Sequence, residues 1–322
     1  MSNFLDPAIL FFIFGVMAGL LKSNLEIPQQ VSRFLSLYLL MALGLKGGFA
    51  LNHSGITAEI SMVLGTAILL AVLIPVLAYF LLSHQLNKLD AAAIAATYGS
   101  ISAVTFITAS QVLDQAGIGY GAYMAAAMAL MESPAIILAI VLANKARVAT
   151  SVSANQGKSL WEILHESFTD GGQILLLGSM LVGYLSGDAG HKVMAPFSID
   201  LFKGMLSFFL LDMGLQAAKS FGYLKNTPKL TIVYALVAPF MHASIALAIA
   251  KLFGFALGET VLLMVLAASA SYIAVPAVLR HALPEVNPAL YMGMSLGLTF
   301  PLNILIGIPV YTYLAKYFIA GA

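Results

Sequence analysis

The chain has 322 residues, of which 61% are hydrophobic and only 9% are charged, and its net charge is +1. A soluble domain carries about 25% charged residues, and a single core of this length could not bury so much apolar surface, so we expect a lipid bilayer around the chain. The near-neutral charge gives no basic surface for nucleic acid, and the absence of cysteine excludes disulfides and thiol chemistry.

Apolar segments of about 20 residues, the length that crosses a bilayer, recur along the whole sequence. The first of them lacks a basic region and a small-residue cleavage site, which favours a retained span over a signal peptide. We therefore predict an all-α integral membrane protein with about ten transmembrane helices. The predicted spans are residues 8–22, 30–50, 57–82, 90–114 and 119–143, followed by 173–187, 197–217, 229–252, 259–281 and 288–318.

The polar segment 144–172 divides the predicted spans into two sets of five. Lys and Arg mark the cytoplasmic side of a membrane protein, and they gather on the side of this segment. The basic residues there are Lys22, Arg33, Lys88, Lys145, Arg147, Lys158, Lys219, Lys225, Lys229 and Arg280, against Lys192, Lys203, Lys251 and Lys316 on the other side. We predict that segment 144–172 is a cytoplasmic loop and that both termini lie outside.

The two halves share landmarks in the same order, and the matches rest on Gly, Pro and Ser rather than on Leu and Val. The matching segments are LMALGLKGGFAL (40–51) with LLDMGLQAAKSF (210–221), TYGSISAVTF (97–106) with ASASYIAVPA (268–277), and MALMESPAII (128–137) with LGLTFPLNIL (296–305). Because each half has an odd number of spans, the second half enters the membrane from the opposite side. We predict two inverted repeats, residues 1–143 and 173–322, an architecture of many secondary transporters.

Small polar residues interrupt the fourth and ninth predicted spans at matching places. Gly99 weakens the first of these helices, and Pro276 in the second cannot donate a backbone hydrogen bond. The N-termini of half-helices and serine hydroxyls attract an anion, while freed carbonyls and hydroxyl oxygens can bind sodium. We predict that helices four and nine are broken and form a cradle for one small anion and its coupling cations. The alternative is that these small residues only allow close helix packing.

Glu132 lies within the fifth predicted span, just before a proline. An ionisable group at that depth is costly and is a functional candidate by default. In the matching segment of the second half, a proline lies between two side chains that carry oxygen. We predict a sodium site with the ligands Glu132, Thr299, Asn303, Ser102 and Thr105. The alternative for the carboxyl group is a protonated acid that is hydrogen-bonded to a neighbouring helix.

Two more charged residues, Lys46 and Asp212, lie at similar depths in the second and seventh predicted spans. We expect them to pair with each other as a structural tie. We also expect a structural hydrogen bond from His242. The sequence shows no set of metal ligands, no nucleotide loop and no nucleophile paired with a base, so we predict a protein that is not an enzyme and has no cofactor besides a coupling sodium ion.

The segment SASYIAVPAVLRHALPEVNPALYMGMSLGLTFPLNILIGIPVY, residues 269–311, resembles the C-terminal signature of the sodium-dependent bicarbonate transporters of cyanobacteria. The similarity extends over most of the chain and is weaker in the first half. It implies ten spans in two inverted repeats, arranged as a gate part and a core part, and a homotrimer in a bacterial inner membrane. It also implies bicarbonate uptake with sodium and, in many members, regulation by a PII-like protein that binds adenine nucleotides.

The resemblance also implies an anion site between the two breaks. The residues are Ser100, Ile101, Ser102, Ala103, Val104 and Thr105 in the first break and Ser269, Ala270 and Ser271 in the second. Our first hypothesis is therefore a sodium-coupled symporter that takes up bicarbonate. The alternatives are a symporter for another small anion, such as a short monocarboxylate, and, from a different class, a membrane receptor or an intramembrane enzyme.

Overall fold

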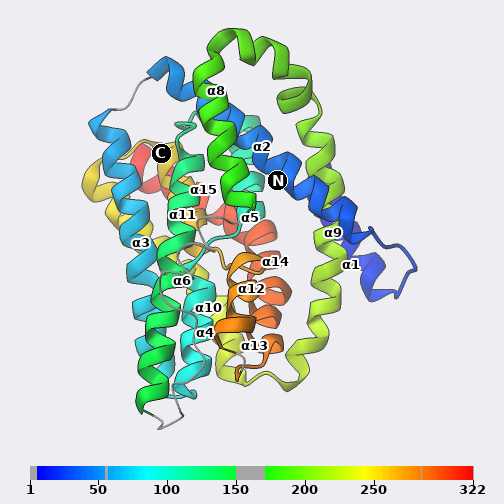
Figure 1. Cartoon of the computed structure of the whole chain (residues 1–322), viewed down its shortest axis with the longest axis vertical. Coiled ribbons are helices and arrows are strands. Elements are labelled where there is room, and N and C mark those ends of the chain that lie inside the picture. The colour runs from blue at the N-terminus through cyan, green and yellow to red at the C-terminus, as the bar shows by residue number, and fades with distance from the viewer. Residues whose placement is uncertain (1–5, 55–56, 150–170, 284, 322) are drawn as a thin grey trace.

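The computed structural model describes residues 6–54, 57–149, 171–283 and 285–321, and all regular structure in these ranges is helical (Figure 1). Six stretches are long and apolar enough to cross a membrane, and Pro7–Leu20 and Leu257–Ala268 are shorter apolar helices. The predicted all-helical class is confirmed. Most of segment 144–172 lies outside the described residues.

The first half contains α1 (Pro7–Leu20), α2 (Gln29–Ser54), α3 (Ala58–Ser83), α4 (Lys88–Gly99), α5 (Ala103–Gln115) and α6 (Met124–Ala149). Side chains of Asp6, Thr57 and Asn87 accept hydrogen bonds from the first backbone N–H groups of α1, α3 and α4, which have no partner inside the helix. α6 begins later than the predicted span 119–143. The chain leaves α5 through a turn at Gly117, whose φ of 65° favours glycine.

The second half contains α8 (Gly171–Ala195), η2 (Pro196–Asp200), α9 (Phe202–Ser220), η3 (Phe221–Asn226), α10 (Lys229–Phe253), α11 (Leu257–Ala268), α12 (Ala274–Ala282), α13 (Pro288–Met292), η4 (Gly293–Thr299), α14 (Phe300–Leu302), η5 (Asn303–Gly307), α15 (Ile308–Ala315) and η6 (Lys316–Ala320). The last stretch is one helical run from Pro288 to Ala320. Its turns widen to the π form on both sides of Pro301, which donates no backbone hydrogen bond.

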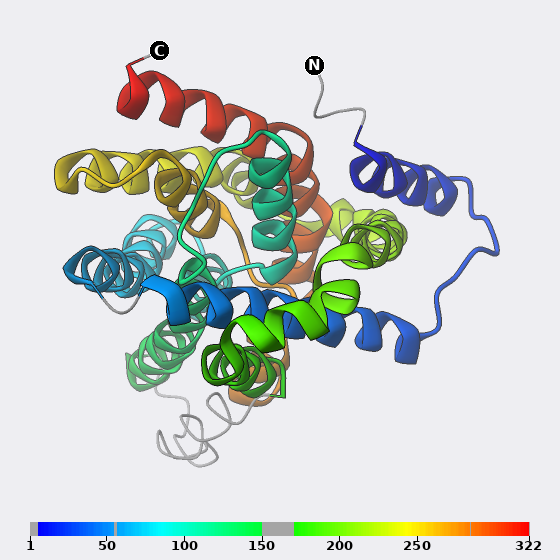
Figure 2. The same cartoon turned by 90° about the horizontal axis from the view of Figure 1, so that it is seen from above.

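Helices α1, α2, α8 and α9 form a four-helix group in which α1 packs along α9 and α2 packs along α8 (Figure 2). The backbones in both pairs come very close. A Cβ added at Gly44 would lie 2.4 Å from the Leu176 carbonyl oxygen, and one added at Gly214 would lie 2.3 Å from that of Phe12. Only glycine allows this approach, which is typical of helix pairs in membranes.

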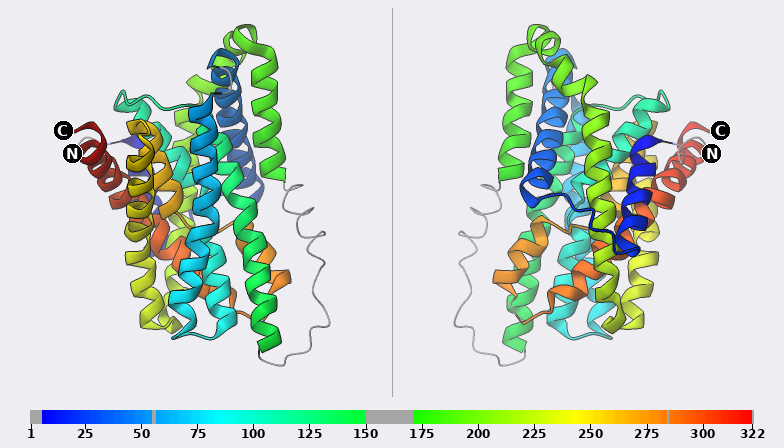
Figure 3. Two further views of the ribbon diagram at one scale, coloured as in Figure 1. Left: turned by 90° about the vertical axis from the view of Figure 1, so that its left-hand side faces the viewer. Right: turned by 90° about the vertical axis from the view of Figure 1, so that its right-hand side faces the viewer.

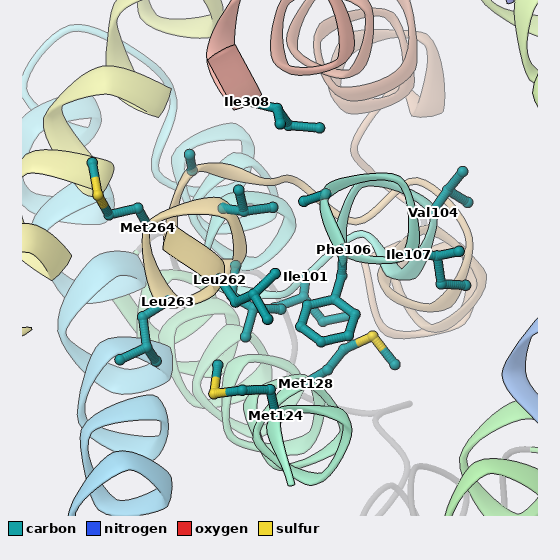
Figure 4. Close-up of a cluster of buried hydrophobic side chains, with 14 of the residues drawn as sticks. Ile101, Val104, Phe106, Ile107, Met124, Met128, Leu262, Leu263, Met264 and Ile308 are labelled. Atoms are coloured by element: carbon teal, nitrogen blue, oxygen red, sulfur yellow. The ribbon is translucent and has the colours of Figure 1, made fainter. Parts of the chain in front are cut away.

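The remaining helices form a second group, which we call the core group: α3, α4, α5, α6 and α10–α15. Its interior is apolar, and Ile101, Phe106, Met128 and Leu262 gather where α5, α6 and α11 meet (Figure 4). Figure 3 shows the hairpin of α8 and α9 extending beyond the core group at one end, while α12 and α13 lie toward the other. The two predicted breaks, between α4 and α5 and between α11 and α12, both lie in this core group.

Candidate functional site

The first break lies between α4 and α5. A side chain at Gly99, the last residue of α4, would collide with Pro75 of α3. Ser100 follows in an extended conformation, with φ −94° and ψ 175°. Ser102 then caps α5, because its Oγ accepts hydrogen bonds from the Thr105 backbone N–H at 3.2 Å and from the Thr105 hydroxyl at 2.9 Å.

The second break lies between α11 and α12. α11 ends at Ala268, and Ser269 follows in an extended conformation, with φ −79° and ψ 164°. The Ser271 Oγ accepts a hydrogen bond from the Val275 N–H at 3.2 Å, which satisfies one free donor in the first turn of α12. Pro276 lies in that same first turn, where a missing N–H costs little, so this proline follows the break.

The two breaks hold each other through backbone hydrogen bonds. The Ser102 N–H donates to the Ser269 Oγ at 3.0 Å. In the other direction, the Ser271 N–H donates to the carbonyl oxygen of Thr97, in α4, at 2.8 Å. All four residues are buried. Each break therefore satisfies a buried backbone donor of the other, and the two interrupted helices meet at one point.

A cavity of about 860 Å³ reaches this meeting point. The predicted anion residues that line it are Ile101, Ser102, Ala103, Val104 and Ser271. The other predicted anion residues are buried and are not among the described residues that line the cavity, namely Ser100, Thr105, Ser269 and Ala270. The cavity therefore exposes the start of α5 and the segment before α12, while the ends of α4 and α11 lie behind them.

Ser100 differs from the other serines in its hydrogen bonding. Its side chain is 1% exposed, and its Oγ has no hydrogen-bond partner among the described residues. Buried hydroxyls in folded proteins usually have a partner. Ser100 therefore keeps hydrogen-bonding capacity next to the meeting point of the breaks.

Glu132 lines the same cavity as Ser102 and Ser271. Its Oε2 accepts a hydrogen bond from the Gln173 Nε2 at 2.7 Å, which connects α6 to the start of α8. The structure thus brings the predicted carboxylate and the predicted serine donors to one cavity. It does so with residues that are far apart in the sequence.

Thr299 and Asn303 lie in a different environment from Glu132. The Thr299 hydroxyl donates to the Ala235 carbonyl oxygen at 2.9 Å and lies 2.6 Å from the Tyr98 hydroxyl. The Asn303 amide donates to the carbonyl oxygen of Ala268 at 2.9 Å, and its Oδ1 accepts from Tyr311 at 2.8 Å. Neither residue is among the described residues that line the cavity. Asn303 instead holds the last carbonyl of α11, directly before the second break.

Sequence reasoning missed Tyr272 and Gln173, which both line the cavity. The Tyr272 hydroxyl interacts with Ser102 and lies 3.7 Å from the Met213 Sδ. The repeat comparison emphasised residues that recur in both halves, and the pairing of Ser102 with Ser271 places Ala103 opposite Tyr272. The position of Tyr272 directly after Ser271 was the sequence feature that could have identified it.

The expected pair of Lys46 and Asp212 is wrong. The Lys46 Nζ lies 2.7 Å from the Asp114 Oδ2 and 2.8 Å from the Tyr120 hydroxyl. Asp212 accepts hydrogen bonds from Ser32 and from Gln216 instead, at 2.5 Å and 2.8 Å. Similar depth in the membrane does not make two residues neighbours, because α2 and α9 present them to different helices.

His242 lies against the backbone of Ala267, in the last turn of α11. Its Nδ1 is buried and makes no hydrogen bond with a described residue, so the structural hydrogen bond expected for His242 stays a prediction. The described residues contain no group of His, Asp or Glu side chains that could hold a metal ion in the manner of a metalloenzyme.

Apolar spans, two interrupted helices that meet in the interior, and a cavity that reaches their serines are the features of a multi-pass membrane transporter. Residues 7–316 match the family described as the Na+-dependent bicarbonate transporter superfamily, and the chain belongs to that family. This is a family of transporters and not of enzymes. None of the curated proteins compared with the chain matches it.

Proposed function

We propose that the chain is a sodium-coupled symporter that takes up bicarbonate and binds it where the two breaks meet. The observation that carries the proposal is the pair of reciprocal hydrogen bonds, Ser102 to Ser269 and Ser271 to Thr97, at the end of one cavity. A small anion can touch few groups at once. Its binding therefore needs several donors fixed in a site with little water, and two crossing half-helices supply them.

The Ser102 hydroxyl is well placed to donate a hydrogen bond. Its oxygen already accepts two hydrogen bonds from Thr105, so both lone pairs are in use and its proton is the group that contacts Tyr272. We propose that a bound anion takes this proton in place of Tyr272. Tyr272 lies beside it and adds a second hydroxyl on the cavity side. We assign the anion to the hydroxyls of Ser102 and Tyr272, together with Ser271 and the first N–H groups of α5.

We assign the sodium ion to oxygen atoms next to that position. The Thr105 hydroxyl donates to Ser102 and keeps its lone pairs for a cation. Glu132 supplies a carboxylate on the same cavity. In the present structure the side-chain oxygens of Thr299 and Asn303 are engaged elsewhere, so their part in the sodium site requires a rearrangement of these hydrogen bonds.

We further infer that the two halves are inverted repeats. The packing supports this, because α2 pairs with α8 while α9 pairs with α1, the pattern expected if α1 corresponds to α8 and α2 to α9. The matching glycines, Gly44 and Gly214, lie at the close approaches of these two pairs. Ser100 and Ser269 likewise share an extended conformation after their helices.

The proposed orientation places both termini outside and segment 144–172 in the cytoplasm of a bacterium. The cavity is lined by the start of α2 and the start of α8, which lie on the side of that segment. The structure would then be open to the cytoplasm. Assembly as a homotrimer and binding of a PII-like regulator are part of the proposal as the family resemblance implies them.

The test is uptake of labelled bicarbonate into proteoliposomes with and without a sodium gradient. We expect uptake that requires sodium outside and that collapses when potassium replaces it. Uptake of acetate with no uptake of bicarbonate would instead support the monocarboxylate symporter. Uptake of neither anion would refute the proposed transport function.

A further inference from the structure

The cavity changes character along its length. On α2, the residues Arg33, Ser36, Leu37 and Leu40 line it, and their spacing puts them on one face of the helix. Arg33 is exposed, whereas Leu40 packs against the apolar core. Seven residues separate the two, a rise of about 10 Å along the helix. The mouth of the cavity is therefore at Arg33, and its deep end is at Leu40.

The walls formed by α9 and α8 also change from polar side chains near the mouth to apolar side chains farther in. On α9, Gln216 is only partly buried, while Phe209 and Met213, earlier in the helix, are 2% exposed. On α8, Gln173 lies near the start and Leu176 lies one turn farther in. An anion that moves from the serines to the mouth therefore passes apolar side chains before it reaches polar ones.

The described residues that line the cavity carry one charge of each sign, and the two charges differ in their partners. Among the described residues that line the cavity, Arg33 is the only Lys or Arg and Glu132 is the only carboxylate. Glu132 is engaged by Gln173, whereas Arg33 makes no ion pair or hydrogen bond with a described residue. The carboxylate repels an anion on this path, and without a cation at the mouth the path would have a net negative charge.

We propose that Arg33 is a specificity-determining residue, which attracts the anion to the mouth and offsets the repulsion from Glu132. The inference rests on the proposed transport of an anion. A guanidinium stays protonated in proteins and is a strong donor to carboxylate oxygens. Walls of low dielectric constant focus its field into the cavity. Arg33 therefore acts on anions that approach from the cavity side only.

The experiment measures half-saturating bicarbonate concentrations on each side of the membrane. Right-side-out and inside-out vesicles from the same cells carry the wild type, Arg33→Lys, Arg33→Gln or Arg33→Glu. Lys229→Glu is the matched control, because Lys229 begins α10 on the same side of the membrane, is exposed and does not line the cavity. Sodium is kept saturating throughout.

On the cavity side at low ionic strength, we expect Arg33→Glu to raise the half-saturating concentration about tenfold and Arg33→Gln to raise it about threefold. Arg33→Lys and Lys229→Glu should match the wild type. The differences should shrink when potassium chloride shortens the Debye length from about 10 Å at 0.1 M to about 3 Å at 1 M. The opposite side should show no change in any variant.

Three results would overturn the inference: no shift for Arg33→Glu, an equal shift on both sides, or the same shift for Lys229→Glu. If the wild type carries acetate and not bicarbonate, the proposed substrate fails, and the same series measured with acetate still decides the role of Arg33. The two failures are therefore distinguishable.

Discussion

At the residue scale, the serine side chains of the two breaks that line the cavity, Ser102 and Ser271, differ in their hydrogen bonding. Ser102 accepts two hydrogen bonds from Thr105, and its own proton contacts Tyr272. Ser271 accepts one from the Val275 N–H, which leaves it one lone pair and its own proton. Both hydroxyls line the cavity. We therefore expect both to donate to the same anion.

Ser102→Ala and Ser271→Ala should each weaken the apparent affinity for bicarbonate by about tenfold to a hundredfold, because a hydrogen bond to a charged group contributes about 1.5–3 kcal/mol. The double variant should be non-additive, since both serines serve one ion. Ser179→Ala is the control, because Ser179 is buried where α8 meets α2. Normal half-saturating concentrations in both single variants would show that these serines only allow close packing.

Glu132→Gln tests the sodium assignment. Glutamine has the same shape as glutamate but no charge, so we expect the sodium concentration for half-maximal uptake to rise, with little change in the amount of protein in the membrane. The measurement is initial uptake against sodium concentration at fixed bicarbonate. An unchanged sodium dependence would instead mean that the contact with Gln173 at 2.7 Å serves structure alone.

At the scale of elements, the C-terminal end of α5 connects the core group to the four-helix group. Asp114 pairs with Lys46 of α2, and Gln115 donates to Asp6, the cap of α1, at 2.6 Å. Lys203 of α9 lies 3.1 Å from the same Asp6 carboxylate. These contacts lie beyond the breaks, away from the mouth of the cavity. We therefore expect them to hold the side opposite the mouth closed.

Asp114→Asn combined with Gln115→Ala should open that side more often. An exposed ion pair contributes only about 0–1 kcal/mol, so we expect a change of about tenfold at most in the population of the two states. Because the chain has no cysteine, Ala103→Cys gives a single label in the cavity. Its reaction with an impermeant thiol reagent should become faster from the side opposite the mouth.

Asp188→Asn is the matched control for this experiment. Asp188 pairs with His53 at 2.8 Å, but both residues belong to the four-helix group, so their contact does not connect the two groups. An equal acceleration in this control, or none in the double variant, would contradict a role for the end of α5 in closing the structure.

The sequence predicted the elements better than their contacts. Polar residues around Gly99 and Ser269 marked both interruptions, because glycine and serine favour helix ends. The role of Asn303 could not be read in the same way. Its hydrogen bond joins residues 35 positions apart on separate helices, and no local spacing encodes such a contact. Lys46 was assigned the wrong partner for the same reason.

At the scale of the whole molecule, the orientation in the membrane decides which state of the transport cycle the open cavity represents. If both termini lie outside, the mouth at Arg33 opens to the cytoplasm and the structure is the state that releases substrate. The basic residues predict this orientation. A mouth on the external side would instead make it the state that captures substrate.

A cysteine introduced within segment 151–157 tests the orientation, since the chain has none of its own. We expect it to react with an impermeant thiol reagent in inside-out vesicles and to be protected in intact cells. Labelling in intact cells would reverse the orientation and, with it, the direction assigned to the cavity.

The reciprocal hydrogen bonds between the breaks also constrain how the protein is made. The Ser102 N–H finds its acceptor on Ser269, 167 residues later in the chain. Until the second half is translated, this donor lacks its acceptor on Ser269, and a bilayer offers a backbone N–H few other partners. We therefore expect the break between α4 and α5 to reach its final conformation only after α11 and α12 have been inserted.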